Sequence, residues 1–341
     1  VPIVLTPFPP TTDLPQHLNQ VILATAHAGD GAGPYAVLWG APNTLVYGFI
    51  FLLERVFSPE FLGRAVLLFL TAAWIFAIFF TAVRRKRPAE GAVLAALFLF
   101  NISFYWGFLN FLAGFPVFIA WFFLTARKEA HPPAWWYAAV MVASFFLYFG
   151  HVLWFIAGAA WFGLTSLLRR LPLRSLVLRA ATLIPAGLFS LFWYRKFAVF
   201  QAASDLNLAP EWINRPFEKP FTLWFRSVAF GGGTGRLETF LFFFLLAWAG
   251  LSLATRRQEW RRRVDADLAS AAGLFFAIAF FAPDTFRNTI YFSGRWAAVS
   301  FILAVLSLPA PRIKPALRRT AAWGAVLVFY LVTTLHWAGY E

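Results

Sequence analysis

Apolar and polar positions in this chain are grouped into long blocks. Six apolar blocks approach or reach the roughly 17–25 residues that one membrane-spanning helix needs. They cover residues 65–83, 176–194, 239–255, 268–283, 296–309 and 320–337. We predict that each of these blocks crosses a membrane once.

Two further blocks, 91–125 and 134–168, hold 35 uncharged residues each. At about 1.5 Å per residue, one helix of that length would be far longer than the roughly 30 Å core of a bilayer. We therefore predict two short spans in each block, joined near its midpoint. The polar residues at these midpoints are Tyr105, Trp106 and Asn110 in the first block and His151 in the second.

Composition supports the same class of protein. The chain has 341 residues, of which 60% are hydrophobic and 13% charged, whereas soluble domains are about half apolar and a quarter charged. We predict an all-α polytopic membrane protein with about 10–11 transmembrane helices. The eleventh would be an upstream helix that ends in VPIVLTPFPP, with a cleaved signal peptide as the alternative. The absence of cysteine excludes disulfides and thiolate metal sites.

The formal net charge of +14 lies on one side of this predicted topology. If the ten spans alternate in direction, nineteen of the 29 Lys and Arg residues fall on one face together with five acidic residues. Cytoplasmic loops are rich in Lys and Arg, so this face is predicted to be cytoplasmic. The positive charge then needs no nucleic-acid partner. The basic segments are Arg84–Arg87, Arg127 with Lys128, Arg169–Arg179, Arg256–Arg263 and Arg312–Arg319.

Four segments follow from this topology. Residues 1–60 are predicted to hold the end of a first helix and an extracytoplasmic loop with interfacial helices, at Pro15–Ala28 and within 34–57. Residues 61–195 hold transmembrane helices that include the two hairpins. Residues 196–238 form an extracytoplasmic loop, and 239–341 hold the C-terminal transmembrane helices.

The first strongly polar segment, Thr11–Gln20, carries the main candidate for chemistry. Asp13 is a good helix N-cap, and Pro15 is tolerated in a first turn. His17 lies four residues after Asp13, so a helix places the carboxylate and the imidazole on one face. A simple helix cap is the competing interpretation.

Other polar residues gather on the same predicted extracytoplasmic face, and each has a structural alternative. Asn110 can satisfy the backbone of a turn, and His151 can be an interfacial histidine. Tyr105 and Trp106 fit an aromatic belt. The sequence GGGTGR at 231–236 lacks the Lys-Ser/Thr of a phosphate loop and is interpreted as a flexible turn.

The arrangement resembles the polytopic glycosyltransferases of the GT-C superfamily, relatives of protein O-mannosyltransferases and aminoarabinose transferases. Asp13, with Pro15 and His17, occupies the position of the acidic residue that opens their first extracytoplasmic loop. The remaining similar segments are PNTLVYGFIFLLERVF at 42–57, the span and turn at 61–87, SFYWGFLNFLAGF at 103–115 and SGRWAAVSFILAVLSLP at 293–309.

The resemblance implies a sugar donor on a polyprenyl phosphate, an inverting transfer at the periplasmic face and a bacterial inner (cytoplasmic) membrane location. Asp13 is then the expected general base. Arg295, followed by Arg287, is the expected ligand of the donor phosphate, because a guanidinium grips two phosphate oxygens. His17 and His151 would assist by hydrogen bonding or share a divalent cation with Asp13. The substrate would also contact Asn110, Trp106 and Tyr105.

Two alternatives stay open. Many GT-C members carry a second acidic residue in a later loop, and here Asp205, Glu211 and Asp284 sit in no matching motif. That departure favours a non-catalytic membrane subunit whose Phe-rich and Trp-rich surfaces contact partner subunits. A lipid-linked-sugar transporter would need charged or helix-breaking residues at mid-membrane depth. Only Pro116 and Pro185 are candidates for such breaks.

Overall fold

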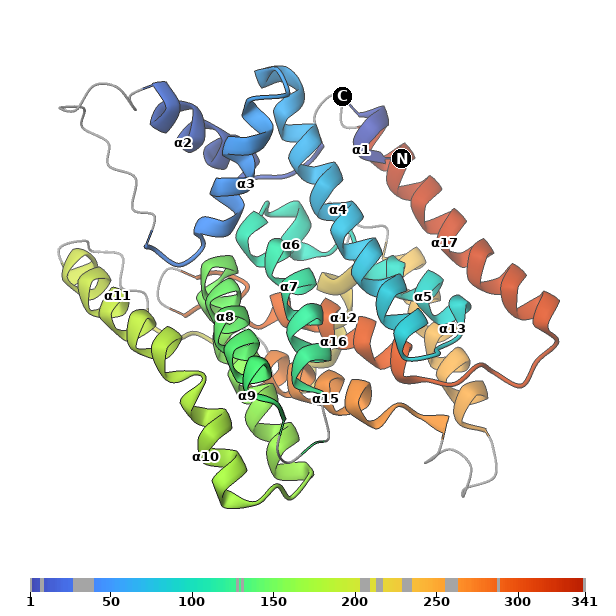
Figure 1. Ribbon diagram of the computed structural model, residues 1–341. Coiled ribbons are helices and arrows are strands. Elements are labelled where there is room, and N and C mark those ends of the chain that lie inside the picture. Colours follow the sequence, from blue (N-terminus) through green and yellow to red (C-terminus); the bar gives the residue numbers. More distant parts are fainter. Residues whose placement is uncertain are drawn as a thin grey trace. The chain divides into compact units, whose positions relative to one another are not determined.

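The computed structural model describes residues 2–6, 9–26, 40–126, 129, 132–202, 209–212, 217–228, 235–254, 263–286 and 289–339. Apart from two isolated β-bridges, the regular secondary structure of these residues is helical (Figure 1). The N-terminal helices are α1 (Pro2–Leu5), α2 (Leu14–Ala26), α3 (Thr44–Glu54), α4 (Pro59–Arg84), α5 (Ala89–Ala95), the 3₁₀ helix η1 (Ala96–Phe98) and α6 (Ile102–Tyr105). The central helices are α7 (Leu109–Thr125), α8 (Ala134–Gly150), α9 (Val152–Leu168), α10 (Leu173–Ala181) and α11 (Ile184–Ala202). The last are α12 (Lys219–Val228), α13 (Arg236–Leu253), α15 (Ala266–Phe281), α16 (Gly294–Ser307) and α17 (Pro315–Ala338).

The protein is a helical membrane protein. Three helices of the described residues, α4, α13 and α17, are long and apolar enough to cross a bilayer, and the bent pair α10–α11 makes a fourth if it is one span. Each of the ten predicted spans coincides with a helix or helix pair, but six of these are apolar helices of 10–17 residues. Full crossing by those six shorter helices stays a prediction.

The fold consists of two compact units. Their boundaries do not coincide with those of the four predicted sequence segments. Unit 1 comprises residues 1–11, 71–106 and 208–341, and unit 2 comprises residues 12–70 and 107–207. Each unit therefore combines stretches that are distant in sequence. The Asp13 region belongs to unit 2 and the Arg295 region to unit 1.

The predicted break in the middle of 134–168 is confirmed in unit 2. Helix α8 ends at Gly150, and His151 has extended backbone (φ −171°, ψ 132°). Its Nδ1 accepts a hydrogen bond of 3.1 Å from the Leu153 N–H and so caps α9. The first turn of a helix lacks internal partners for its N–H groups. The His151 imidazole therefore stabilises the start of α9.

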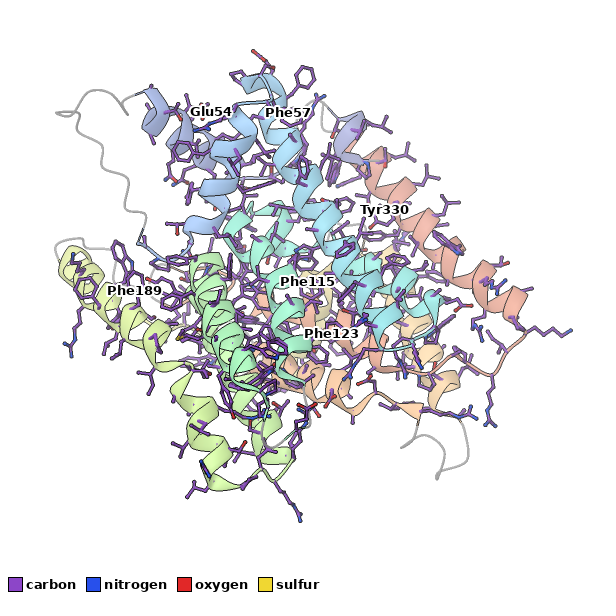
Figure 2. The ribbon with its side chains drawn as sticks, in the orientation of Figure 1. Glu54, Phe57, Phe115, Phe123, Phe189 and Tyr330 are labelled. Atoms are coloured by element: carbon purple, nitrogen blue, oxygen red, sulfur yellow. The ribbon has the colours of Figure 1, made fainter. Side chains whose placement is uncertain are left out.

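Tryptophan side chains fit against glycines to hold α7 and α9 together. The Trp154 ring lies against Gly114 of α7, and its Nε1 donates to the Phe111 carbonyl at 2.8 Å. The Trp121 Nε1 donates to the Gly158 carbonyl at 3.0 Å. Indole N–H groups need such partners when they are buried. Phe115 is fully buried beside Trp154 (Figure 2).

The predicted span at 176–194 contains a break in the structure. Helix α10 ends at Ala181, α11 begins at Ile184, and the two helices are bent by 47°. Pro185 sits in the first turn of α11, where its missing N–H has no cost. By contrast, Pro116 lies inside α7 without interrupting it. Phe189 of α11 packs edge-on against the Tyr148 ring of α8, with centroids 5.4 Å apart (Figure 2).

Unit 1 is built on the contact between α15 and α16. Phe275 of α15 stacks on Trp296 of α16 with centroids 5.4 Å apart, and the Ser300 hydroxyl donates to the Ala272 carbonyl at 2.9 Å. Helix α17 joins this unit through Tyr330, whose hydroxyl donates to the Ala96 carbonyl at 2.9 Å (Figure 2).

Two helices lie within the described part of the segment 196–238, which was predicted to be a loop. Helix α11 continues into it as far as Ala202, and α12 forms within it at Lys219–Val228. Leu223 and Val228 of α12 are fully buried. The polar composition of the segment hid this short amphipathic helix, whose apolar side packs on α16.

The Trp154–Gly114 contact can be tested by adding one methyl group. A Cβ on Gly114 would lie 1.9 Å from Trp154 Cδ1, so Gly114→Ala is expected to destabilise the protein by about 1–3 kcal/mol through overpacking. Gly163 of α9 is the matched control, because a Cβ there meets no atom within 4 Å. We expect Gly163→Ala to be neutral or stabilising by up to about 1 kcal/mol. Thermal unfolding in detergent measures both, and equal effects would contradict the packing account.

Candidate functional site

Asp13 occupies the N-cap position of α2. Its main-chain carbonyl accepts the first helical hydrogen bond, from the His17 N–H at 3.1 Å, as the sequence predicts. Gly107 packs directly on this helix start, since a Cβ on Gly107 would lie 2.9 Å from both the Asp13 and the Leu14 nitrogens. Its φ of +71° is also one that favours glycine. The chain entering α7 is therefore fitted closely to the end of α2 that carries Asp13.

A chain of hydrogen bonds joins α2 to α3. The Tyr47 hydroxyl of α3 donates to Gln20 Oε1 at 2.6 Å, and its oxygen lies 2.7 Å from His17 Nδ1. Asn110 also donates a hydrogen bond to Tyr47. The Tyr47 hydroxyl therefore links the His17 ring to the Gln20 side chain. We call Asp13, His17, Gln20, Tyr47 and Asn110 the Asp13 cluster.

Opposing effects act on the His17 imidazole. Burial lowers its pKa, while the nearby Asp13 carboxylate and the Gly107 carbonyl raise it. Burial is the largest effect, so the pKa of His17 lies below its ordinary value of 6.5. At neutral pH the ring is therefore uncharged and acts in this cluster as a hydrogen-bonding group that orients its neighbours.

An unused acceptor remains in the Asp13 cluster. Asn110 Oδ1 is buried and has no hydrogen-bond partner among the described residues. A buried polar atom without a partner is uncommon and calls for an explanation. The cluster thus combines a partly exposed carboxylate, a neutral imidazole and a free amide oxygen, a set that suits binding and deprotonation of a hydroxyl group.

A second polar cluster forms within unit 1 around Asp284. Asp284 Oδ1 accepts a hydrogen bond from the Ser293 hydroxyl and pairs with Arg226 Nη1 of α12 at 2.8 Å. The Arg226 guanidinium lies over the Tyr291 ring, 4.9 Å from its centroid. The Lys219 Nζ donates to the Ala282 carbonyl at 2.7 Å. We call Lys219, Arg226, Asp284, Tyr291 and Ser293 the Asp284 cluster.

Positive charge exceeds negative charge in the Asp284 cluster. Lys219 and Asp284 are both almost fully buried. Burial lowers the pKa of Lys219, with Asp284 raising it and Arg226 lowering it further. Tyr291 has φ +50°, a left-handed conformation that is strained for a bulky side chain. Strain of this kind gathers at functional sites.

The predicted site residues fall into both units. Asp13, His17 and Asn110 come together in the Asp13 cluster of unit 2. Trp106 lies in unit 1, where its ring is 5.2 Å from that of Tyr291. Arg295 is buried at the start of α16, and its Nη2 donates to the Ile290 carbonyl at 2.9 Å.

Two other predicted site residues, Tyr105 and His151, make contacts that stabilise the fold. Tyr105 is buried among aromatic rings of unit 1, and its hydroxyl accepts a hydrogen bond of 3.3 Å from Trp337 Nε1. His151 caps α9 and contacts the Phe111 ring edge-on. Arg287 and residues 231–234 lie outside the described residues.

Sequence reasoning did not single out Tyr47, Gln20, Lys219 or Arg226. A detectable signal existed for Lys219, because it shares a helix face with the apolar Leu223 four residues on. A lysine on the apolar face of a short helix indicates a buried charge that needs partners. Tyr47 gave no such signal, because its role depends on contacts with residues distant in sequence.

Within the part of the chain that the structure describes, no three His, Asp or Glu side chains gather closely enough to hold a metal ion. Searches against protein-family models, curated proteins and solved structures found no match to the chain. The two clusters are therefore the features of this chain that bear on its function.

The state of His17 leads to a pH prediction. Its pKa is lowered by folding, so between that value and about 6.5 the unfolded chain binds more protons than the folded one. Stability is then expected to fall as the pH drops below about 6.5 and to level off below the folded pKa. Lowering the pH from about 7.5 to about 5.5 should reduce the melting temperature of the wild type more than that of His17→Gln. An equal pH dependence in both proteins would contradict a buried neutral His17.

The Arg226–Asp284 pair leads to a stability prediction. Arg226→Ala leaves the buried Asp284 carboxylate without its guanidinium partner, which is expected to cost about 3–5 kcal/mol. Arg236→Ala is the control, because Arg236 is exposed at the start of α13 and should change stability by no more than about 0.5 kcal/mol. Denaturant unfolding in detergent compares the two variants. Similar small effects would show that the pair is not important for folding.

Proposed function

We propose that this protein is a membrane glycosyltransferase of GT-C type that uses a polyprenyl-phosphate-linked sugar as donor. The observation that carries the proposal is the position of Asp13 at the start of α2, beside a neutral His17 that Tyr47 orients. The resemblance to GT-C enzymes that the sequence suggests at 42–57, 61–87, 103–115 and 293–309 motivates the same proposal. The site would face the periplasmic side of a bacterial inner membrane.

In the proposed reaction, Asp13 takes the proton from the acceptor hydroxyl. The hydroxyl oxygen then forms a bond to the anomeric carbon of the sugar, on the face opposite the phosphate. The bond between that carbon and the phosphate oxygen breaks, and polyprenyl phosphate leaves with the electron pair. Asn110 Oδ1, buried and unpaired, supports this role because it can accept a hydrogen bond from the sugar or the acceptor.

The donor phosphate needs cations to stabilise the negative charge that develops on it. The proposal gives this role to Arg295, with Arg287 as the second candidate. This role is supported by an excess of positive charge in the Asp284 cluster. There, Lys219 and Arg226 lie near the single carboxylate of Asp284. Tyr291 and Trp106 add aromatic faces beside these cations, and such faces suit contact with a sugar ring or a prenyl chain.

The test is the release of polyprenyl phosphate. Purified protein in lipid nanodiscs is mixed with an extract of polyprenyl-phosphate sugars and acceptors from its own membranes, and the product is followed by mass spectrometry. The wild type should release polyprenyl phosphate. Asp13→Asn is expected to lose at least about 100-fold in rate, the lower range for a general base, with an unchanged melting temperature.

Glu60→Gln is the matched control, because Glu60 is an exposed carboxylate at the start of α4 and should keep full activity. Full activity in Asp13→Asn would remove Asp13 from the mechanism. Lack of release by the wild type under all donor conditions would instead favour the non-catalytic subunit, in which Asp13 is only a helix cap.

A further inference from the structure

A cavity of about 520 Å³ opens in unit 1 where two candidate membrane spans have their ends. Helix α4 ends at Arg84, shortly before the lining residues Lys86 and Arg87 in the sequence. Helix α17 begins at Pro315, shortly before the lining residues Arg318 and Arg319. Its charged and aromatic lining comprises Phe79, Lys86, Arg87, Glu90, Arg318, Arg319 and Trp323. Four cations and one carboxylate therefore surround the space.

Two of the four cations hold the walls of the cavity in place. Arg87 donates to the main-chain carbonyls of Arg263, Leu306 and Ser307 at 2.9, 3.1 and 2.7 Å. Arg318 Nε pairs with Glu90 Oε1 at 2.9 Å. These bonds join the turn after α4 to α16 and join α5 to α17, so the basic wall is preorganised before any ligand arrives.

The other two cations are more available. Lys86 is exposed, and Arg319 is 71% exposed and lies 3.9 Å from the Glu90 carboxylate that Arg318 already binds. One carboxylate cannot neutralise four cations, so the cavity keeps an excess of three positive charges. An anion that enters it meets two mobile cations in front of a fixed basic wall.

Apolar side chains border the same cavity. Trp323, one helical turn after Arg319, is exposed on α17, and Phe79 lies on α4. Tryptophan is typical of membrane–water interfaces, and basic pockets at the cytoplasmic ends of spans bind anionic lipid head groups. The combination of cations at the ends of two spans with aromatic rings along them matches a phosphate head group and its acyl chains.

We infer that this cavity binds the phosphodiester of an anionic phospholipid on the predicted cytoplasmic face. Inorganic phosphate offers the same charge chemistry without acyl chains, and the aromatic border favours the lipid. The inference does not depend on the proposed transferase activity, since every residue it uses is separate from the Asp13 and Asp284 clusters.

The experiment is native mass spectrometry of the full chain in detergent, titrated with phosphatidylglycerol. The test variant is the double substitution Lys86→Gln with Arg319→Gln, which leaves Arg87 and Arg318 to hold the fold. Each cation near a membrane surface contributes roughly fivefold to the binding of anionic lipid. Affinity for phosphatidylglycerol should therefore fall about 25-fold in the double variant.

The double substitution Arg170→Gln with Arg174→Gln is the matched control. Arg170 shares the φ of +51° seen at Lys86, Arg174 is exposed like Arg319, and both lie on the predicted cytoplasmic face. The control should bind phosphatidylglycerol within about twofold of the wild type, since it leaves the four cavity cations in place. An equal loss in both double variants would overturn the inference, because general surface charge would then explain binding.

Inorganic phosphate and phosphatidylcholine separate the possible ligands. We expect neither to displace phosphatidylglycerol from the wild type at equal concentration. Displacement by inorganic phosphate would overturn the lipid assignment in favour of a free anion. Displacement by phosphatidylcholine would overturn the role of net charge. The melting temperatures of both double variants, compared with the wild type, show whether the fold is intact in each measurement.

Discussion

Polar groups away from water need protein partners, and this constraint decides several helix ends and helix contacts in the chain. Without water, an unpaired N–H, carbonyl or charge costs several kcal/mol. Arg87 meets the constraint by binding three main-chain carbonyls, and Trp121 and Trp154 meet it by donating their indole hydrogens to carbonyls of neighbouring helices. His151 meets it by capping α9. The start of α9, the turn after α4 and the α7–α9 contact are therefore stabilised by the same kind of bond.

Much of the secondary structure follows from sequence length and polarity. Thirty-five uncharged residues cannot form one span, so a break near His151 was predictable, and the structure has it. The start of α2 was predictable from Asp13 and Pro15. Both predictions work because they depend on neighbouring residues and on the fixed thickness of a bilayer.

Sequence patterns missed features that residues distant in the chain decide. The bend between α10 and α11 accompanies the burial of Arg179 against Trp136, although Arg179 was assigned to a cytoplasmic loop. Helix α12 forms in a polar segment because Leu223 and Val228 find a buried surface. In the same way, Tyr47 belongs to the Asp13 cluster and Arg226 to the Asp284 cluster through contacts that only the fold creates. No local pattern links these residues to Asp13 or Asp284.

The Asp13 cluster and the Asp284 cluster suit different kinds of ligand chemistry. The Asp13 cluster holds a carboxylate, a neutral imidazole and an unpaired amide oxygen, a set suited to handling hydroxyl groups. The Asp284 cluster holds more positive than negative charge beside aromatic rings, a set suited to an anionic lipid-linked ligand. The glycosyltransferase reaction proposed above calls for both kinds of chemistry.

The most direct measurement is native mass spectrometry of the protein released gently from its own membrane. The account predicts a protein that carries polyprenyl phosphate or its sugar conjugate, identified by the mass of the bound lipid. A stoichiometric assembly with other subunits and without any such lipid would contradict it.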